Sequence, residues 1–270
     1  MKSTRIGNHH KLNPNLLVQE KSNHYLCPMI IGADFEKISV KWGNLIVLEP
    51  NTLLTDTLLA LTCVYLAIKI WKGHSKNPFV NWYMAFFFML GVSTFTGGLG
   101  HAFYHYLGTP GKFFGWFTAV LAVFFIERAM ISFVYNQKLL IVYKWFSWVK
   151  MIAVYALVTW LCLTKNVMEK PEIGFLPIAI NTIIGTILSA GILGVVFYRK
   201  HAAPFHLFAI GVLAMLPAAV FFLWKINLHP WMDKNDVSHI LVSIGNVFFY
   251  TGIVRVAPEL EMKFNTQREA

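Results

Sequence analysis

Seven long apolar segments separated by short polar stretches set the pattern of the chain. Each is close to the roughly 20 residues that a helix needs to cross the hydrocarbon core of a bilayer. Backbone amides inside lipid must bond within their own segment, and none of the seven shows the alternation of a transmembrane β-strand. They are therefore predicted to be helices, at about residues 48–71, 80–107, 113–133, 139–163, 173–198, 204–226 and 237–256.

The polar remainder divides the chain into three parts. Residues 1–45 lack a sustained period and are expected to form a loosely ordered tail, without a cleaved signal peptide because no apolar stretch follows the basic start. Residues 46–257 form the predicted transmembrane domain, and residues 258–270 a short charged tail. Lys144 and Lys150 interrupt the fourth apolar segment, so its first part is a candidate for a position in the membrane interface.

The composition excludes a water-soluble domain. Of the 270 residues, 56% are hydrophobic and only 13% are charged, whereas soluble proteins carry about 25% charged residues. The 23 Lys and Arg, which give a net charge of +10, are scattered over loops without a basic stripe, so they indicate loops beside a membrane and no nucleic-acid binding. The three cysteines lack CxxC spacing and indicate neither a disulfide framework nor a zinc site. The predicted fold is all-α, a polytopic seven-transmembrane helix bundle.

Lys and Arg are divided unevenly between two sets of loops. Loops one, three and five and the C-terminal tail contain Lys69, Lys72, Lys76, Lys138, Arg199, Lys200, Arg255, Lys263 and Arg268, whereas loops two, four and six contain Lys112, Lys165, Lys170 and Lys234. Because Lys and Arg accumulate on the cytoplasmic side, we expect an integral membrane protein with a cytoplasmic C-terminus and an N-terminus that is outside or lumenal.

A pair of histidines stands out in the stretch GGLGHAFYHYLG at residues 97–108. His101 and His105 are four residues apart, so on a helix they share one face. Two imidazoles at this spacing can bind one metal ion, as in the helical HExxH motif, or they can pack and hydrogen-bond.

The number and direction of the predicted helices place further polar residues at the same membrane depth as this pair. The end of the second segment and the starts of the first and seventh lie in one leaflet, which places Asp56 and Asp236 with His101, His105 and His239. Several ionisable groups at one depth indicate a wet cavity. The functional interpretation is a zinc site with three histidine ligands, in which Asp236 or Asp56 is a further ligand or the base for a bound water. The alternative is that the histidines bond between helices and that Asp236 caps the seventh helix.

Glu127 and Arg128 lie near the far end of the third segment. Adjacent residues on a helix point apart, so the two side chains cannot share one environment. We expect them to snorkel to the interface or to form an ion pair with a neighbouring helix there.

Three short motifs resemble the CREST superfamily of seven-helix membrane proteins, which includes alkaline ceramidases and the progestin and adipoQ receptors. Residues 49–52 (EPNT) resemble the ExN motif at the start of the first helix, His101 resembles the zinc ligand of the second helix, and residues 235–239 (NDVSH) resemble the HxxxH segment of the seventh. The resemblance assigns Glu49 and Asn51 to a calcium site.

The chain departs from the CREST pattern at three positions. Gly97 stands where the family has a serine, Asn235 replaces the first histidine of HxxxH, and the start of the third segment lacks the aspartate. A zinc site would then take His105 or Asp236 as the replacement ligand. The resemblance implies zinc-dependent hydrolysis of a lipid amide, in which metal-bound water attacks the carbonyl.

Two functions from different classes follow from these patterns. The first is a zinc-dependent hydrolase acting on a membrane lipid, and the alternative is a non-enzymatic, receptor-like or lipid-binding seven-helix protein without a complete metal site. Both have membrane lipids as partners, and the second takes a lipid or small-molecule ligand. A bis-histidine haem would need histidines on different helices at matching depth. A transporter is less favoured, because the chain has neither paired broken helices nor an internal repeat.

Overall fold

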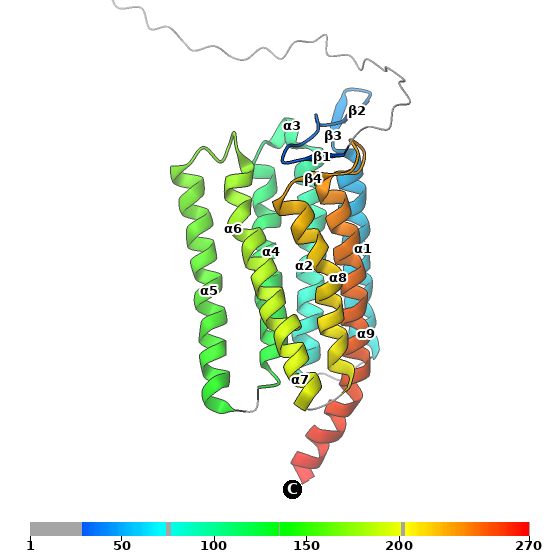
Figure 1. The fold of residues 1–270 in the computed structure, drawn as a ribbon, viewed down its shortest axis with the longest axis vertical. Coiled ribbons are helices and arrows are strands. Elements are labelled where there is room, and N and C mark those ends of the chain that lie inside the picture. Colours follow the sequence, from blue (N-terminus) through cyan, green and yellow to red (C-terminus); the bar gives the residue numbers. More distant parts are fainter. Residues whose placement is uncertain (1–28, 74–76, 135, 201–202, 270) are drawn as a thin grey trace, which may run out of the picture.

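A bundle of seven membrane-spanning helices forms most of the computed structural model, which describes residues 29–73, 77–134, 136–200 and 203–269 (Figure 1). The helices long and apolar enough to cross a membrane are α1 (Pro50–Gly73), α2 (Pro78–Ala102), α4 (Pro110–Ile131), α5 (Gln137–Thr164), the span Pro171–Lys200, α8 (His206–Leu223) and α9 (Lys234–Glu269, with the span ending at Pro258). This confirms the prediction of an all-α multi-pass bundle.

The helix starts follow from residues that supply caps or lack a backbone donor. Pro78, Pro110 and Pro171 each occupy the first helical position, where no amide hydrogen is needed. Before α2 the side chain of Asn77 accepts a hydrogen bond from the amide of Val80, and before α5 Asn136 does the same for Lys138 and Leu139.

Three predicted segments differ in detail from the structure. The second is divided, because α2 ends at Ala102 and a short helix, α3 (Tyr104–Leu107), follows after Phe103. The fifth consists of two α-helices, α6 (Pro171–Thr186) and α7 (Gly194–Lys200), which are joined by the π-helix η1 (Ile187–Leu193). A 3-10 turn, η2 (Ala203–Phe205), precedes α8. The seventh continues as helix to Glu269, so the residues expected to form a separate tail after 257 extend α9.

Four short strands cover one end of the bundle, which we call the strand end (Figure 1). There β1 (Ile30–Ile31) pairs antiparallel with β4 (Ile226–Asn227), and β2 (Ser39–Trp42) pairs with β3 (Leu45–Leu48) through a turn at Gly43, whose φ is 61°. Residues 29–45 thus contain strands that pair with each other or with the bundle, in place of the expected loose tail, whereas residues 1–28 lie outside the described part.

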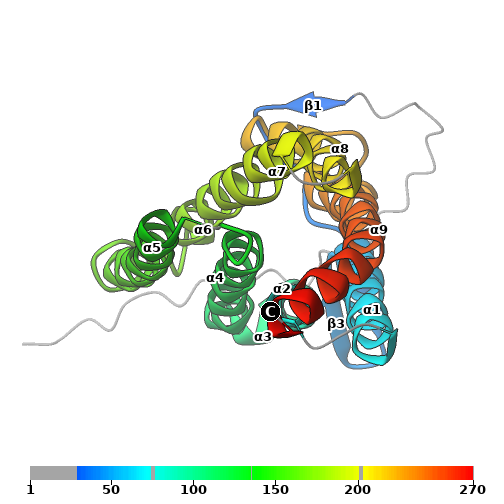
Figure 2. The same cartoon turned by 90° about the horizontal axis from the view of Figure 1, so that it is seen from below.

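An ion pair connects α5, at the edge of the bundle, to α4 and α6 (Figure 2). The Nζ atom of Lys150 on α5 lies 2.7 Å from Oε1 of Glu127 on α4 and donates to Oδ1 of Asn181 on α6 at 2.5 Å. The Ser147 hydroxyl donates to the other Glu127 oxygen at 2.8 Å. Glu127 and Ser147 are buried, so these contacts explain how a helix interrupted by lysine still spans the membrane.

Candidate functional site

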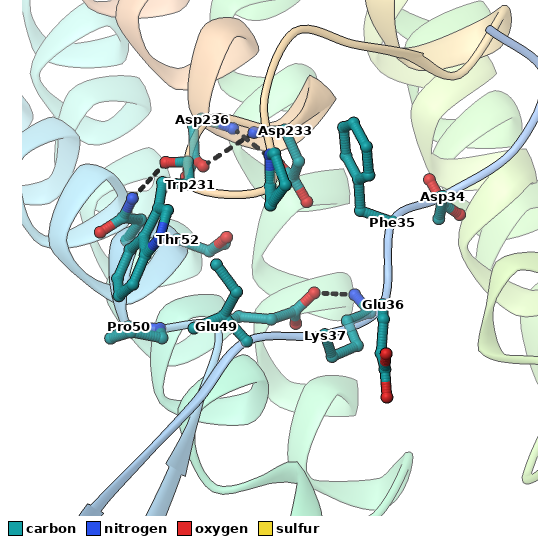
Figure 3. Close-up of a pocket in the computed structure, with 13 residues that line it drawn as sticks. Asp34, Phe35, Glu36, Lys37, Glu49, Pro50, Thr52, Trp231, Asp233 and Asp236 are labelled. Carbon is teal, nitrogen blue, oxygen red and sulfur yellow. Dashed lines mark hydrogen bonds and ion pairs between the residues drawn. The ribbon is translucent and has the colours of Figure 1, made fainter. Parts of the chain in front are cut away.

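A pocket opens at the strand end, between the strands and the beginnings of α1 and α9 (Figure 3). It encloses about 400 Å³, part of which is its open mouth. Five carboxylates and one lysine line it, together with aromatic, proline and small polar residues. The lining residues are Asp34, Phe35, Glu36, Lys37, Ile38, Glu49, Pro50, Asn51, Thr52, Pro230, Trp231, Asp233 and Asp236.

Glu49 connects this pocket to the first histidine. It sits between β3 and α1 with a φ of 46°, and its carboxylate pairs with Lys37 on one side. Its Oε2 atom lies 2.5 Å from Nδ1 of His101, near the end of α2. The Nζ atom of Lys112, from the first turn of α4, lies 3.4 Å from the same Nδ1 atom. His101 is therefore held between an acidic and a basic side chain.

The second histidine, His239 on α9, is bonded through both ring nitrogens. Its Nε2 atom lies 3.2 Å from Oδ1 of Asp56, and its Nδ1 atom lies 3.0 Å from Oγ1 of Thr55. The Thr55 hydroxyl can also donate to Oδ1 of Asp236 at 3.0 Å or to the Thr52 carbonyl at 3.2 Å. A neutral imidazole has one donor and one acceptor nitrogen, so the direction of each contact follows from the tautomer of the ring.

Asp233, rather than Asp236, caps α9. Its Oδ1 atom accepts hydrogen bonds from the amides of Asn235 at 2.7 Å and Asp236 at 3.2 Å, the usual geometry of an N-cap. The second oxygen of Asp236 accepts from the amide of Asp233 at 3.1 Å, and the Asp236 side chain is buried. Asp236 thus lies on the boundary between the pocket and His239.

Glycines let the three helices that carry these residues approach closely. A Cβ atom at Gly98 of α2 would lie 2.8 Å from Cβ of Asp56 on α1, and one at Gly100 would lie 2.8 Å from the carbonyl oxygen of Gly111 on α4. Small residues at crossing points are typical of helix packing in membranes. The close crossings bring Asp56 and Lys112 to the depth of His101.

The structure brings four of the five predicted site residues together. His101, His239, Asp56 and Asp236 lie at the strand end between α1, α2 and α9, and with Glu49, Thr55 and Lys112 they form what we call the strand-end site. His105 is separate: it is exposed on α3, with its ring 4.9 Å from the ring of Tyr106. The turn at Phe103 breaks the helical register, which is why His101 and His105 do not share a face.

The donor set does not fit zinc in this arrangement. Among the described residues, no three His, Cys, Asp or Glu side chains converge closely enough to hold a metal ion. Both nitrogens of His239 are occupied by neighbours, and the Lys112 ammonium stands beside His101. The proposed calcium residues are also engaged, since Glu49 pairs with Lys37 and the Asn51 amide donates to the carbonyl of Trp231.

Sequence reasoning did not connect three members of the strand-end site with the histidines. Lys112 follows the turn at residues 108–111, and helix counting alone places it at the same end as His101. Thr55 precedes Asp56, but adjacent helical residues diverge by about 100°, so nothing in the sequence indicates that both contact one ring. Glu49 entered only through the resemblance to a calcium motif.

Charged side chains attach the segment before β2 to the bundle. Asp34 pairs with Lys234 and, at 3.7 Å, with Lys225, and it accepts from the Asn227 amide at 3.2 Å. Partial burial raises the pKa of Asp34, but the bonds and charges of these three residues outweigh it and hold the pKa below its usual 3.8. Burial lowers the pKa of the Lys37 ammonium, which lies among the same charges.

Acidification is expected to release this segment. Because the pKa of Asp34 is lower in the folded state, its contribution is present above the usual value of 3.8 and is lost as the pH falls through the folded-state value. Hydrogen exchange, corrected for intrinsic rates, should show residues 29–38 losing protection below about pH 4. Asp34→Asn should expose them already at pH 7, whereas Glu36→Gln, on the same segment, should leave them protected. Equal protection in Asp34→Asn and the parent protein would contradict this anchor.

These features define a multi-pass membrane protein with seven helices and a buried polar site at one end. The chain belongs to the family described as a family of unknown function (DUF6962), whose sequence model matches residues 51–258. The match covers the membrane-spanning helices from the first turn of α1 to the end of the last span. No curated protein and no solved structure matches the chain significantly.

Proposed function

We propose that this protein is a receptor-like or lipid-binding seven-helix membrane protein that takes up its ligand at the strand-end pocket without metal-dependent hydrolysis. The observation that carries the proposal is the bonding of the two histidines. His101 is bonded to Glu49 and stands beside the Lys112 ammonium, and His239 is bonded to Asp56 and Thr55. A metal ion would have to displace these partners and tolerate the adjacent ammonium charge.

The pocket favours a ligand with a positively charged group. Five of the 13 acidic residues of a chain with a net charge of +10 line it, against a single lysine. Phe35 and Trp231 add aromatic rings, whose faces attract cations. An amine or quaternary ammonium head on an apolar tail matches both the pocket and the surrounding bilayer.

Hydrogen bonds offer a route from the pocket into the bundle. On one side Glu49 bonds to His101 near the end of α2, and on the other Asp236 bonds through Thr55 to His239 on α9. A ligand that draws the Glu49 or Asp236 carboxylate toward itself would weaken these bonds on two helices at once. This coupling is the reason for the receptor-like proposal.

The proposal includes an orientation of the protein in the membrane and a relationship to a known superfamily. The uneven distribution of Lys and Arg supports a pocket that faces the outside or a lumen, with the C-terminus in the cytoplasm. The order of Glu49, His101 and His239 supports a distant relation to the CREST superfamily, in which this chain keeps the scaffold and has exchanged the metal ligands.

The test combines metal analysis with ligand binding. We expect the full chain, purified in a mild detergent, to carry no stoichiometric zinc and to gain several degrees of thermal stability with a long-chain primary amine, but not with a carboxylate of equal length. Asp236→Asn should weaken amine binding about tenfold, the value of one hydrogen bond to a charged group. Glu172→Gln, an exposed acidic residue at the same end, should bind as the parent does.

Two results would overturn this proposal. Stoichiometric zinc that is lost in His101→Ala and His239→Ala, together with hydrolysis of a lipid amide, would favour the metal-dependent hydrolase. Equal stabilisation by the amine and the carboxylate would show that the pocket does not select charge.

A further inference from the structure

Arg128 occupies the opposite end of the bundle, in a position that the strand-end site does not explain. It lies three residues before the end of α4 at Ile131, which is about 5 Å inside the helix end. Trp82 lies a similar distance from the start of α2 at Pro78, and these two helix ends are on the same side of the molecule (Figure 1). Both residues therefore lie near the ends of their helices on the side opposite the strand end.

Aromatic rings hold the Arg128 guanidinium in place. Its carbon atom Cζ lies 5.5 Å from the ring centre of Trp82 and 5.9 Å from that of Phe124. Trp82 in turn stacks on Phe125 at 5.6 Å, and Phe124 contacts Trp148 of α5 at 4.6 Å. The guanidinium therefore lies beside Trp82 of α2 and Phe124 of its own helix, which restricts its motion and lowers the entropy lost when it binds an anion.

The charge of Arg128 has no counterpart among the described residues. Its Nε and Nη1 atoms are buried without a hydrogen-bond partner. The neighbouring carboxylate, Glu127, is already bonded to Lys150 and Ser147, and no other described carboxylate pairs with Arg128. An unbonded donor in or beside hydrocarbon is costly, so this geometry calls for an acceptor from outside the chain.

We propose that Arg128 binds the phosphate of a membrane lipid in the leaflet at this end. The side chain as a whole is partly exposed although Nε and Nη1 are covered, so the guanidinium must turn slightly for a phosphate oxygen to reach these two atoms. The guanidinium fork matches phosphate geometry, and a phosphate supplies both the missing acceptor and the missing charge. A lipid is favoured over a free anion because the flanking rings and helices provide an apolar surface for its acyl chain. Lys200, in the last turn of α7 at the same end, would favour an anionic lipid.

The experiment measures lipid bound to the purified full chain. We expect native mass spectrometry to show a retained anionic phospholipid, and titration with phosphatidylglycerol to raise the unfolding temperature more than phosphatidylcholine does. Arg128→Gln should weaken phosphatidylglycerol binding about tenfold or more, since one hydrogen bond to a charged group is worth about that factor. Arg128→Lys keeps the charge but loses the fork and should recover only part of the affinity.

Matched controls separate this site from general attraction to a basic surface. Arg199→Gln, which removes an exposed arginine at the same end, should leave binding within about twofold of the parent, as expected for a charge outside the site. Equal losses in Arg128→Gln and Arg199→Gln would overturn the proposal, as would unchanged binding in Arg128→Gln. A full stabilising effect of inorganic phosphate without lipid would overturn the lipid as the ligand. Circular dichroism of each variant confirms that its helices are intact.

Discussion

Replacing Glu127 by leucine is expected to destabilise the bundle by about 3–5 kcal/mol, the cost of leaving a buried charge without its partner. Lys150 would lose its carboxylate in the middle of α5, 13 residues from the start of that helix at Gln137 and 14 from its end at Thr164. These separations correspond to about 20 Å of helix on either side, and the Lys150 side chain is only 17% exposed, so the ammonium would stay inside the bundle without a carboxylate partner.

The double variant Glu127→Leu/Lys150→Met tests this reason directly. It removes both charges and keeps the side-chain volumes close to the original, so it should recover most of the loss or exceed the stability of the parent. Unfolding by heat and by denaturing detergent, followed by circular dichroism, provides the measurement. A double variant as unstable as Glu127→Leu alone would show that packing at position 127, rather than the unpaired charge, is decisive.

The same ion pair illustrates where prediction from this sequence succeeds and where it ends. The seven helices could be predicted because each apolar run matches the thickness of a bilayer, a property local to its own segment. Lys150 makes the fourth helix harder to predict, because a single sequence does not show that a carboxylate on another helix lies at the same depth. Which residue pairs with Glu127 depends on how α4 and α5 are rotated about their own axes. The sequence does not define this rotation, because the surfaces of both helices are almost uniformly apolar.

The strand-end site shows a similar division. Helix counting places Asp56, His101, Asp236 and His239 at one end, because depth follows from sequence position and chain direction. The choice of bonds within that end is set by side-chain directions, so the pairing of His239 with Asp56 and Thr55 could not be foreseen. His105 lies apart for a local reason: α2 ends at Ala102 instead of continuing through Phe103, so the spacing of four residues does not put His101 and His105 on one helix face.

The geometry of the strand-end site depends on the absence of a side chain at Gly98, and Gly98→Leu should destabilise the protein by about 2–3 kcal/mol, as expected for overpacking. A Cβ atom there would lie 2.8 Å from Cβ of Asp56 and 3.3 Å from its Oδ2 atom. Either α1 moves away from α2 or the Asp56 side chain rotates away from His239. In both cases amine binding at the pocket should weaken with the stability.

Gly97 supplies the matched control, because it is the preceding residue on the same helix and a Cβ atom there meets nothing within 4 Å. Gly97→Leu should leave amine binding unchanged and stability unchanged or raised by up to about 1 kcal/mol, since leucine favours helix more than glycine does. If Gly98→Leu and Gly97→Leu unfold at the same temperature and bind amine equally, the close crossing of α1 and α2 does not control the site. If Gly98→Leu alone loses amine binding, the contact between Asp56 and His239 is part of the connection from the pocket to α9.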